Sequence, residues 1–315
     1  MLVLTRADVE ELLDLDRLVD AVGGALADLS GGRASMPARI AALVPEQEGL
    51  LGVMPSYLPG ASLAVKLVTL FPRNRDRHTH QAAIMVFDHR NGTPTALMDG
   101  TYITATRTAA ASALATRLLA RADARTLAIV GTGVQARSHA RALVRVRDIA
   151  EIRVAGRDPA KVRELADELG ARACATYEEA VRGADVVATT THSTEPVIRR
   201  EWLEPGTHVN SVGLNPQGRE VDDATVDAAA VFVESRESAL APPPAGAPDL
   251  VGVDPAGVTE LGEIVLREHP GRSGQEEVTL YKSVGVAVED AVAAALVLKA
   301  ARERGAGLEI QLEEL

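Results

Sequence analysis

Residues 127–157 read LAIVGTGVQARSHARALVRVRDIAEIRVAGR, and this stretch decides the fold. The short apolar run 127–130 enters the glycine turn GTGVQA, an amphipathic segment follows to about residue 146, and a second apolar run covers 152–155. This order predicts a strand, a glycine turn, a helix and a second strand. Such a unit is typical of a doubly wound parallel sheet that binds a dinucleotide.

Each glycine of the turn has its own task in such a unit. Gly131 makes the tight turn, Gly133 lets a pyrophosphate approach the helix N-terminus, and Ala136 allows close packing of the helix on the strand. The second strand ends at Gly156 and Arg157, where the residue that reads the adenosine ribose is expected. An acidic residue there favours NAD, whereas a guanidinium favours a 2′-phosphate. Arg157 therefore predicts NADPH as the preferred cofactor, with NADH as the alternative.

Composition narrows the class of protein. A chain of 315 residues with 46% hydrophobic content is long enough for two domains. The net charge of −11 and the aromatic content of 3% argue against nucleic acid as a partner. No apolar run reaches the roughly 18 residues that span a bilayer, and the N-terminus turns acidic before a signal-peptide core. We therefore expect a cytoplasmic protein with no membrane contact.

Metal and disulfide sites are not expected. Cys174 is the only cysteine, so no intrachain disulfide can form. His78, His80 and His89 lie at a turn and strand start with no carboxylate partner at helical distance, which is a poor metal-ligand pattern.

The segments before the glycine turn predict a separate α+β part. Helices are expected over 6–13 and 16–30, strands of an antiparallel sheet over 40–44, 49–54, 62–70, 82–88 and 95–98, and an alanine-rich helix over 104–122. After Arg157, helices and strands alternate as in a parallel sheet, and a long helix is expected over 286–304.

Three cations of the first part lie where the structure changes. Arg39 precedes the first expected strand, Lys66 interrupts an apolar strand, and Arg107 falls in the first turn of the expected helix 104–122. A charge inside an apolar run is costly unless it is paired or reaches a polar pocket. A bound carboxylate or phosphate would suit a cation in a first helical turn.

Seven stretches together resemble the ornithine cyclodeaminase and mu-crystallin family. They are MPAR, AVKLVTLFPRN, HQAAIMVFDHRNGTPTALMDGTYITATRTAAASALAT, IVGTGVQA, HVNSVG, ELGEIV and LYKSVGVAVEDAVAA, between about residues 36 and 297. The resemblance implies a Rossmann-type sheet inserted in an α+β substrate-binding and dimerisation domain, and a homodimer. We accordingly expect a first domain over 1–118, a Rossmann domain over 119–289 and a C-terminal helix over 290–315 that returns to the first domain.

The resemblance also implies roles for individual residues. Arg39, Lys66 and Arg107 would bind the substrate carboxylate, with Lys66 assisting proton transfer. The expected cofactor-binding residues are Gly131, Gly133, Val134, Gln135, Arg157, Thr191, Val212, Ser283 and Val284, the last two near the nicotinamide.

One departure from the family pattern bears on the reaction. Ornithine cyclodeaminases carry a catalytic aspartate after the strand that ends in Val-Gly, where this chain reads Val212-Gly213-Leu214-Asn215-Pro216. Asn215 can orient a group but cannot take a proton. We therefore expect an NADPH-dependent reductase of a small cyclic ketimine or α-imino acid, with Lys66 and Asn215 as catalytic residues. The alternatives are an ornithine cyclodeaminase, an alanine-type amino acid dehydrogenase, and an NADPH-dependent binder of a small carboxylate ligand.

Overall fold

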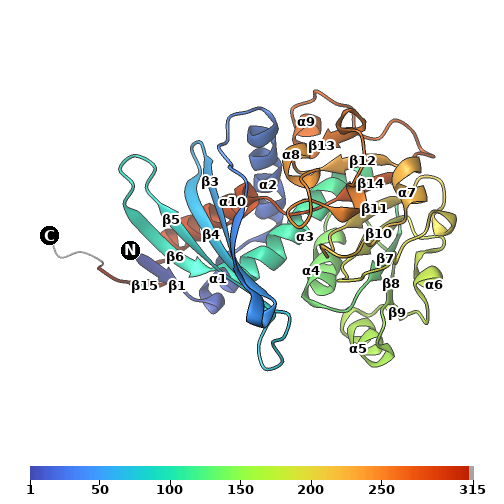
Figure 1. The fold of residues 1–315 in the computed structure, drawn as a ribbon, viewed down its shortest axis with the longest axis horizontal. Coiled ribbons are helices and arrows are strands. Elements are labelled where there is room, and N and C mark those ends of the chain that lie inside the picture. Colours follow the sequence, from blue (N-terminus) through green and yellow to red (C-terminus); the bar gives the residue numbers. More distant parts are fainter. Residues whose placement is uncertain (312–315) are drawn as a thin grey trace. The chain divides into compact units, whose positions relative to one another are not determined.

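The computed structural model describes residues 1–311. The internal contacts of the chain define two units (Figure 1): unit 1 consists of Met1–Arg107 and the chain from Val286 onward, and unit 2 of Thr108–Gly285. The predicted α/β fold, in which a doubly wound parallel sheet is inserted in an α+β domain, is confirmed. The expected domain boundaries at 118/119 and 289/290 concern parts that fold independently, and they remain a prediction.

Unit 1 is built on a seven-stranded sheet in the order β15-β1-β6-β5-β4-β3-β2. From β2 to β6 each strand is antiparallel to its neighbour, whereas β1 runs parallel to β6. The strands are β1 (Leu2–Leu4), β2 (Ile40–Val44), β3 (Gly49–Leu58), β4 (Ser62–Leu70), β5 (His80–Phe87), β6 (Pro94–Asp99) and β15 (Leu308–Glu309). The predicted antiparallel strands are all present, and β3 is longer than expected.

Helices pack on this sheet. The last helix, α10 (Ala287–Arg304), contacts α2 (Leu15–Ser30) and strands β3, β4 and β5, while α1 (Arg6–Leu12) contacts α10 and β6. Side chains along β3 and β4 alternate between buried and more exposed. One face of the sheet therefore forms the core of unit 1, as the period of two predicts.

Unit 2 is built on an eight-stranded parallel sheet in the order β13-β12-β14-β11-β10-β7-β8-β9. Its strands are β7 (Thr126–Val130), β8 (Glu151–Ala155), β9 (Arg172–Ala173), β10 (Val186–Thr189), β11 (His208–Ser211), β12 (Ala230–Val233), β13 (Val258–Glu260) and β14 (Thr279–Lys282). The helices between them are α4 (Val134–Leu143), α5 (Pro159–Leu169), α6 (Tyr177–Val181), α7 (Asp223–Ala228), α8 (Arg236–Ala239) and α9 (Leu261–Val265). Short 3-10 turns cover Pro45–Gln47 in unit 1 and Arg200–Trp202, Pro248–Leu250 and Pro255–Gly257 in unit 2.

The strand order places a topological switch between β7 and β10. From β7 the chain adds β8 and β9 on one side and then returns to add β10 and β11 on the other. In such sheets ligands bind outside the carboxyl ends of the strands at the switch. The segments after β7, β10, β11 and β14 therefore form the edge where a dinucleotide is expected.

The alanine-rich helix differs from the prediction at its ends. It is α3 (Gly100–Leu119), not 104–122, because Asp99 caps it by accepting a hydrogen bond from the Tyr102 amide at 2.8 Å. The prediction that Arg107 lies in the first helical turn was therefore wrong, and its place in the helix gives no reason to expect a bound anion there.

None of the helices within residues 1–311 has the length and apolar character required to cross a lipid bilayer.

Candidate active site

Lys66 lies on the buried face of β4. Its side chain is 2% exposed, and its Nζ is 2.6 Å from Oδ2 of Asp290 on α10. Because a lone buried ammonium is strongly unfavourable, this ion pair permits a lysine at a core position. The sequence indicated that a charge at this place is costly unless it is paired or reaches a polar pocket, and the structure shows it paired with Asp290.

Arg107 belongs to the same buried cluster. Its Nε donates to Oδ1 of Asp290 at 3.0 Å and its Nη1 to Oε2 of Glu289 at 2.7 Å. Asp290 thus pairs with both Lys66 and Arg107. The structure brings these two predicted substrate-binding cations together, one from β4 and one from α3.

Burial and neighbouring charge set the protonation of the cluster. Burial, followed by the positive charge of Arg107, lowers the pKa of Lys66 to about 8, although Asp290 opposes the shift. Burial alone would raise the pKa of Asp290, but the charges of Arg107 and Lys66 outweigh it and hold that pKa below its usual value. At neutral pH Lys66 is therefore mostly an ammonium whose proton is unusually easy to release.

His80 lies close enough to this cluster for the charges of Lys66 and Arg107 to affect its pKa. Burial, then the charges of Lys66 and Arg107, lower the pKa of His80 to about 4. Its ring is accordingly neutral at physiological pH and offers a hydrogen-bonding group without adding charge.

Arg39 directly precedes β2 and is half-buried. Ile40 pairs with Val53, and Met54 pairs with Lys66. Continuing this register by one residue would set Arg39 opposite Met54, in the same cross-strand row as Lys66. Its role in carboxylate binding remains a prediction.

The glycine turn of unit 2 has the form that dinucleotide binding requires. Gly131 has a φ of +123°, and a Cβ there would lie 2.4 Å from Oγ1 of Thr190, so only glycine fits. Gly133 is the N-cap of α4, has no side-chain cap, and nothing lies within 4 Å of a Cβ built on it. The first turn of α4 therefore has no side-chain cap on its amides and no atom crowding Gly133, the conditions under which a pyrophosphate can approach a helix N-terminus.

Val134, Gln135 and Arg157 are three further residues predicted to contact the cofactor. Val134 is 53% exposed, and Oε1 of Gln135 is buried with no hydrogen-bond partner within residues 1–311. Arg157 follows β8, is exposed, and makes no side-chain hydrogen bond or ion pair with the described part of the chain. These features suit a dinucleotide, but cofactor contact by these three residues remains a prediction.

The remaining predicted cofactor residues lie at the carboxyl ends of three strands. Thr191 follows β10, Val212 follows β11, and Ser283 and Val284 follow β14. Since β10, β11 and β14 are adjacent in the sheet, the structure brings these four residues to one edge.

Asn215 holds the loop after β11. Its Nδ2 donates to the Ser193 carbonyl at 3.1 Å, and its Oδ1 accepts from the Gln217 amide at 3.0 Å. These contacts link its loop to the one that follows β10. A direct part for Asn215 in the reaction remains a prediction.

Several buried charged residues, in the Lys66 cluster of unit 1 or at the strand ends of unit 2, were not assigned a role from the sequence. They are Glu289 and Asp290 in unit 1, and Glu220, Glu234, Asp249 and Lys282 in unit 2, all at most 3% exposed. Glu289 and Asp290 lie in the stretch LYKSVGVAVED. This stretch identified the segment as typical of the family, but it did not show which residues pair with the two acids.

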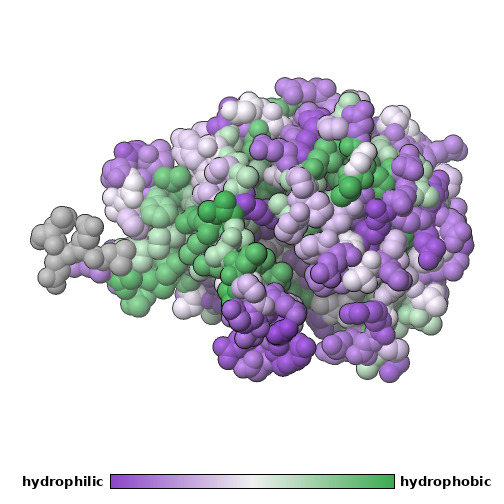
Figure 2. Space-filling model, viewed as in Figure 1, coloured by the Kyte–Doolittle hydropathy of each residue, from purple (hydrophilic) through white to green (hydrophobic). Residues whose placement is uncertain are grey.

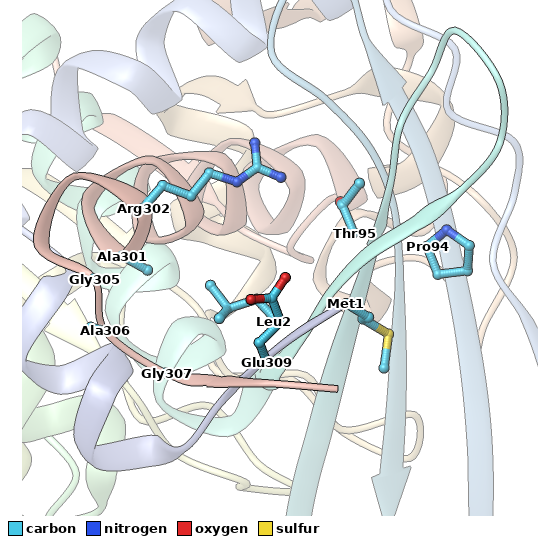
Figure 3. Close-up of a pocket in the computed structure, with 10 residues that line it drawn as sticks. All are labelled: Met1, Leu2, Pro94, Thr95, Ala301, Arg302, Gly305, Ala306, Gly307 and Glu309. Carbon is cyan, nitrogen blue, oxygen red and sulfur yellow. The ribbon is translucent and has the colours of Figure 1, made fainter. Parts of the chain in front are cut away.

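A pocket of about 430 Å³ lies elsewhere in unit 1 (Figure 3). Arg302 of α10 and Glu309 of β15 are on its lining, together with residues of β1 and β6. None of the predicted substrate or cofactor residues lines it, so we give it no part in the chemistry.

Comparison with known proteins settles the family. The model of the ornithine cyclodeaminase/mu-crystallin family matches residues 1–305. The chain belongs to this family. A mouse relative, ketimine reductase mu-crystallin, is 40% identical over 289 residues, which cover 89% of this chain and 90% of that protein.

Solved structures of family members have the same fold. Δ1-pyrroline-2-carboxylate reductase of Thermococcus litoralis, in complex with NADH and L-proline, matches with a TM-score of 0.92 and 36% identity, covering 98% of this chain and 100% of that one. An archaeal alanine dehydrogenase dimer with bound NAD matches with a TM-score of 0.92 and 31% identity over 99% of both chains.

The predicted binding of a substrate carboxylate at Lys66 can be tested through the lowered pKa of this residue. A carboxylate binds the ammonium form better, so its affinity should fall as pH rises through about 8, by up to about tenfold per pH unit. The measurement is the dissociation constant of pyrrole-2-carboxylate by calorimetry between pH 6.5 and 9.5, since this ligand does not titrate in that range. In Lys66→Met the binding should be weaker and independent of pH, and an unchanged pH dependence in that variant would contradict the assignment.

Proposed function

We propose that this protein is an NAD(P)H-dependent reductase of a small cyclic ketimine or α-imino acid, such as a pyrroline- or piperideine-2-carboxylate, giving an L-amino acid. The observation that carries the proposal is the buried cluster of Lys66 and Arg107 in a chain whose second unit has a dinucleotide-binding turn. The names of the mouse and Thermococcus relatives support this reaction class.

Charge balance explains how the cluster receives a carboxylate. Lys66 and Arg107 face the two acids Glu289 and Asp290, so the four groups together carry no net charge. A bound carboxylate adds a negative charge that needs a further cation, and Arg39 in the same cross-strand row is the predicted source. The substrate carboxylate would then lie against Lys66 and Arg107 in bonds that fix the orientation of the ring.

Lys66 is also suited to supply the proton that imine reduction needs. Reduction of the C=N bond adds a hydride to the carbon and a proton to the nitrogen. A lysine with a pKa near 8 is protonated at neutral pH and gives up its proton more readily than an ordinary lysine. Asp290, 2.6 Å from Nζ, keeps the amine in place through the transfer.

The dinucleotide, when bound, supplies the hydride. The part of the protein is to hold it: the open first turn of α4 for the pyrophosphate, and the segments after β10, β11 and β14 for the nicotinamide half.

The proposed reaction can be tested by NADPH oxidation. Purified protein should consume NADPH with five- or six-membered cyclic 2-carboxy imines, and Lys66→Met should lower kcat/KM by about 10² or more, the usual contribution of a positioned proton donor, while NADPH still binds. Normal turnover in Lys66→Met would refute the role of Lys66.

Two other reactions are tested alongside. Pyruvate with ammonia is followed by NADPH oxidation, but ornithine with NAD is followed by ammonia release, because cyclodeamination oxidises and re-reduces the substrate with no net change in the cofactor. The likeness to alanine dehydrogenase favours testing pyruvate with ammonia, and the family membership favours testing ornithine with NAD. Activity on pyruvate and ammonia alone would make the protein an amino acid dehydrogenase. Activity on ornithine would show that a group other than Asn215 serves as the base. Tight NADPH binding with no turnover on any substrate would favour a binding protein.

NADPH is the proposed preferred cofactor because the exposed guanidinium of Arg157 can pair with a 2′-phosphate. Arg157→Ala should raise the KM for NADPH by about tenfold or more, about 1.4 kcal/mol, and change the KM for NADH by less than about twofold. Equal changes for the two cofactors would contradict this preference. We expect the reaction to take place in the cytoplasm, where this cofactor is present.

The second face of the unit 1 sheet supports a homodimer. Ile40, Leu51 and Leu67 are 67%, 39% and 38% exposed, and by strand register they share this face with half-buried Val53 and Val65. Figure 2 shows apolar residues gathered over the sheet of unit 1. A solvated sheet face is ordinarily polar, so an apolar one is expected to be covered, and a second copy of the chain is the proposed cover.

Light scattering tests the dimer. Wild-type protein should have twice the mass of one chain, and Leu51→Glu should shift it toward the monomer, because a charge in an apolar interface lacks a partner. Val251→Glu, at a residue of unit 2 that is 64% exposed, is the control and should leave the mass unchanged. A monomeric wild-type protein would refute the proposal.

A further inference from the structure

Glu220 lies in the segment between β11 and α7 of the parallel sheet, and the residue is 2% exposed. Five donors surround it, from the segments that end β10 and β11. Oε1 accepts from the Thr191 amide (2.6 Å) and hydroxyl (2.7 Å), and Oε2 accepts from the Thr189 hydroxyl (2.7 Å), the Ser211 hydroxyl (3.0 Å) and the Gly213 amide (2.7 Å). One side chain thus fixes two loops that leave adjacent strands.

The pattern of donors requires a carboxylate. A hydroxyl can reverse its role and accept, but a backbone amide can only donate. Oε1 faces the Thr191 amide and Oε2 faces the Gly213 amide, so each oxygen has a donor that cannot be reversed. A glutamine in place of Glu220 would set its NH₂ group against one of these amides in either orientation. The change would therefore release one of the two loops.

A buried ion pair, Lys282 with Asp249, contacts the same segments as Glu220. Lys282, at the end of β14, lies 2.9 Å from Oδ2 of Asp249 and donates to the Ser211 hydroxyl at 3.0 Å and the Gly213 carbonyl at 2.7 Å. Oδ1 of Asp249 accepts from the backbone amide of Glu220 at 2.8 Å. Strands β11 and β14 and the segment that carries Glu220 are joined in one network.

Glu234 has the corresponding arrangement at the next strand end. It follows β12, is fully buried, and accepts from three groups of the segment after β14. Oε1 accepts from the Ser283 hydroxyl (2.5 Å) and the Gly285 amide (3.0 Å), and Oε2 from the Val284 amide (3.3 Å). Again each oxygen faces a backbone amide.

We propose that Glu220 and Glu234 are positioning residues that hold the nicotinamide-binding loops after β10, β11 and β14 in one geometry. The inference rests on the proposed function only in that a nicotinamide dinucleotide binds at this edge. The Gly131 turn and the end of β8 take the pyrophosphate and adenosine ribose, and the strands on the other side of the switch take the second nucleotide half. The two carboxylates therefore act on the nicotinamide half alone.

The test compares a whole dinucleotide with the same molecule lacking nicotinamide. By calorimetry, Glu220→Gln should weaken NADPH binding by about tenfold or more, the usual loss when a buried donor is left unpaired. Binding of 2′-phospho-ADP-ribose, which lacks the nicotinamide, should change by less than about twofold. The pair of NADH and ADP-ribose should show the same difference. At saturating NADPH, kcat should also fall, because hydride transfer depends on the placement of the ring.

Asp222→Asn is the matched control, since it makes the same change two residues along the chain. Asp222 caps α7 by accepting from Thr225, and an asparagine also caps, so both ligands should bind as in the wild type. Glu234→Gln provides an independent variant and should show the same split if Glu220→Gln does not fold. Equal weakening of both ligands, or unchanged NADPH binding, would overturn the proposal. These binding measurements need no imine, so a failure of the proposed reaction would appear separately.

Discussion

A positive charge buried in a protein core needs a negative partner, and unit 1 depends on how this need is met. Lys66 on β4 and Arg107 on α3 are both almost fully buried, and both pair with Asp290 on α10. The last long helix must therefore return to the first sheet and pack on β3, β4 and β5. The same contacts that form the core set the protonation of Lys66, so the packing of unit 1 and its proposed chemistry have one origin.

In unit 2, buried carboxylates accept hydrogen bonds from the backbone at the ends of the parallel strands. Its central strands are buried and parallel, and the segments that leave them must find partners for their amides away from water. Glu220 and Glu234 accept those amides and hydroxyls, while Lys282 and Asp249 join the strand ends beneath them. The edge where a cofactor is expected is thus shaped by side chains that need not touch it.

Local features of the sequence predicted most of the fold. The glycine turn and its flanking apolar runs are contiguous, and residues 127–157 contain everything that specifies the βαβ unit. The unusual position of Lys66 could also be recognised from the sequence, because the apolar run that surrounds it in β4 is contiguous. The partner of Lys66 could not be predicted, because Lys66 and Asp290 are far apart in sequence and only tertiary packing brings them together. Likewise, the cap at Asp99 moved the start of α3 and with it the place of Arg107 in the helix.

The way the chain is divided has a consequence for its synthesis. Unit 2 is continuous in sequence from Thr108 to Gly285, whereas unit 1 is formed by the segments before and after it. On the ribosome, Lys66 and Arg107 emerge long before Glu289 and Asp290, so the first sheet lacks these two counter-charges until α10 has been made. The whole of unit 2 has therefore been synthesised before the ion pairs of unit 1 can form.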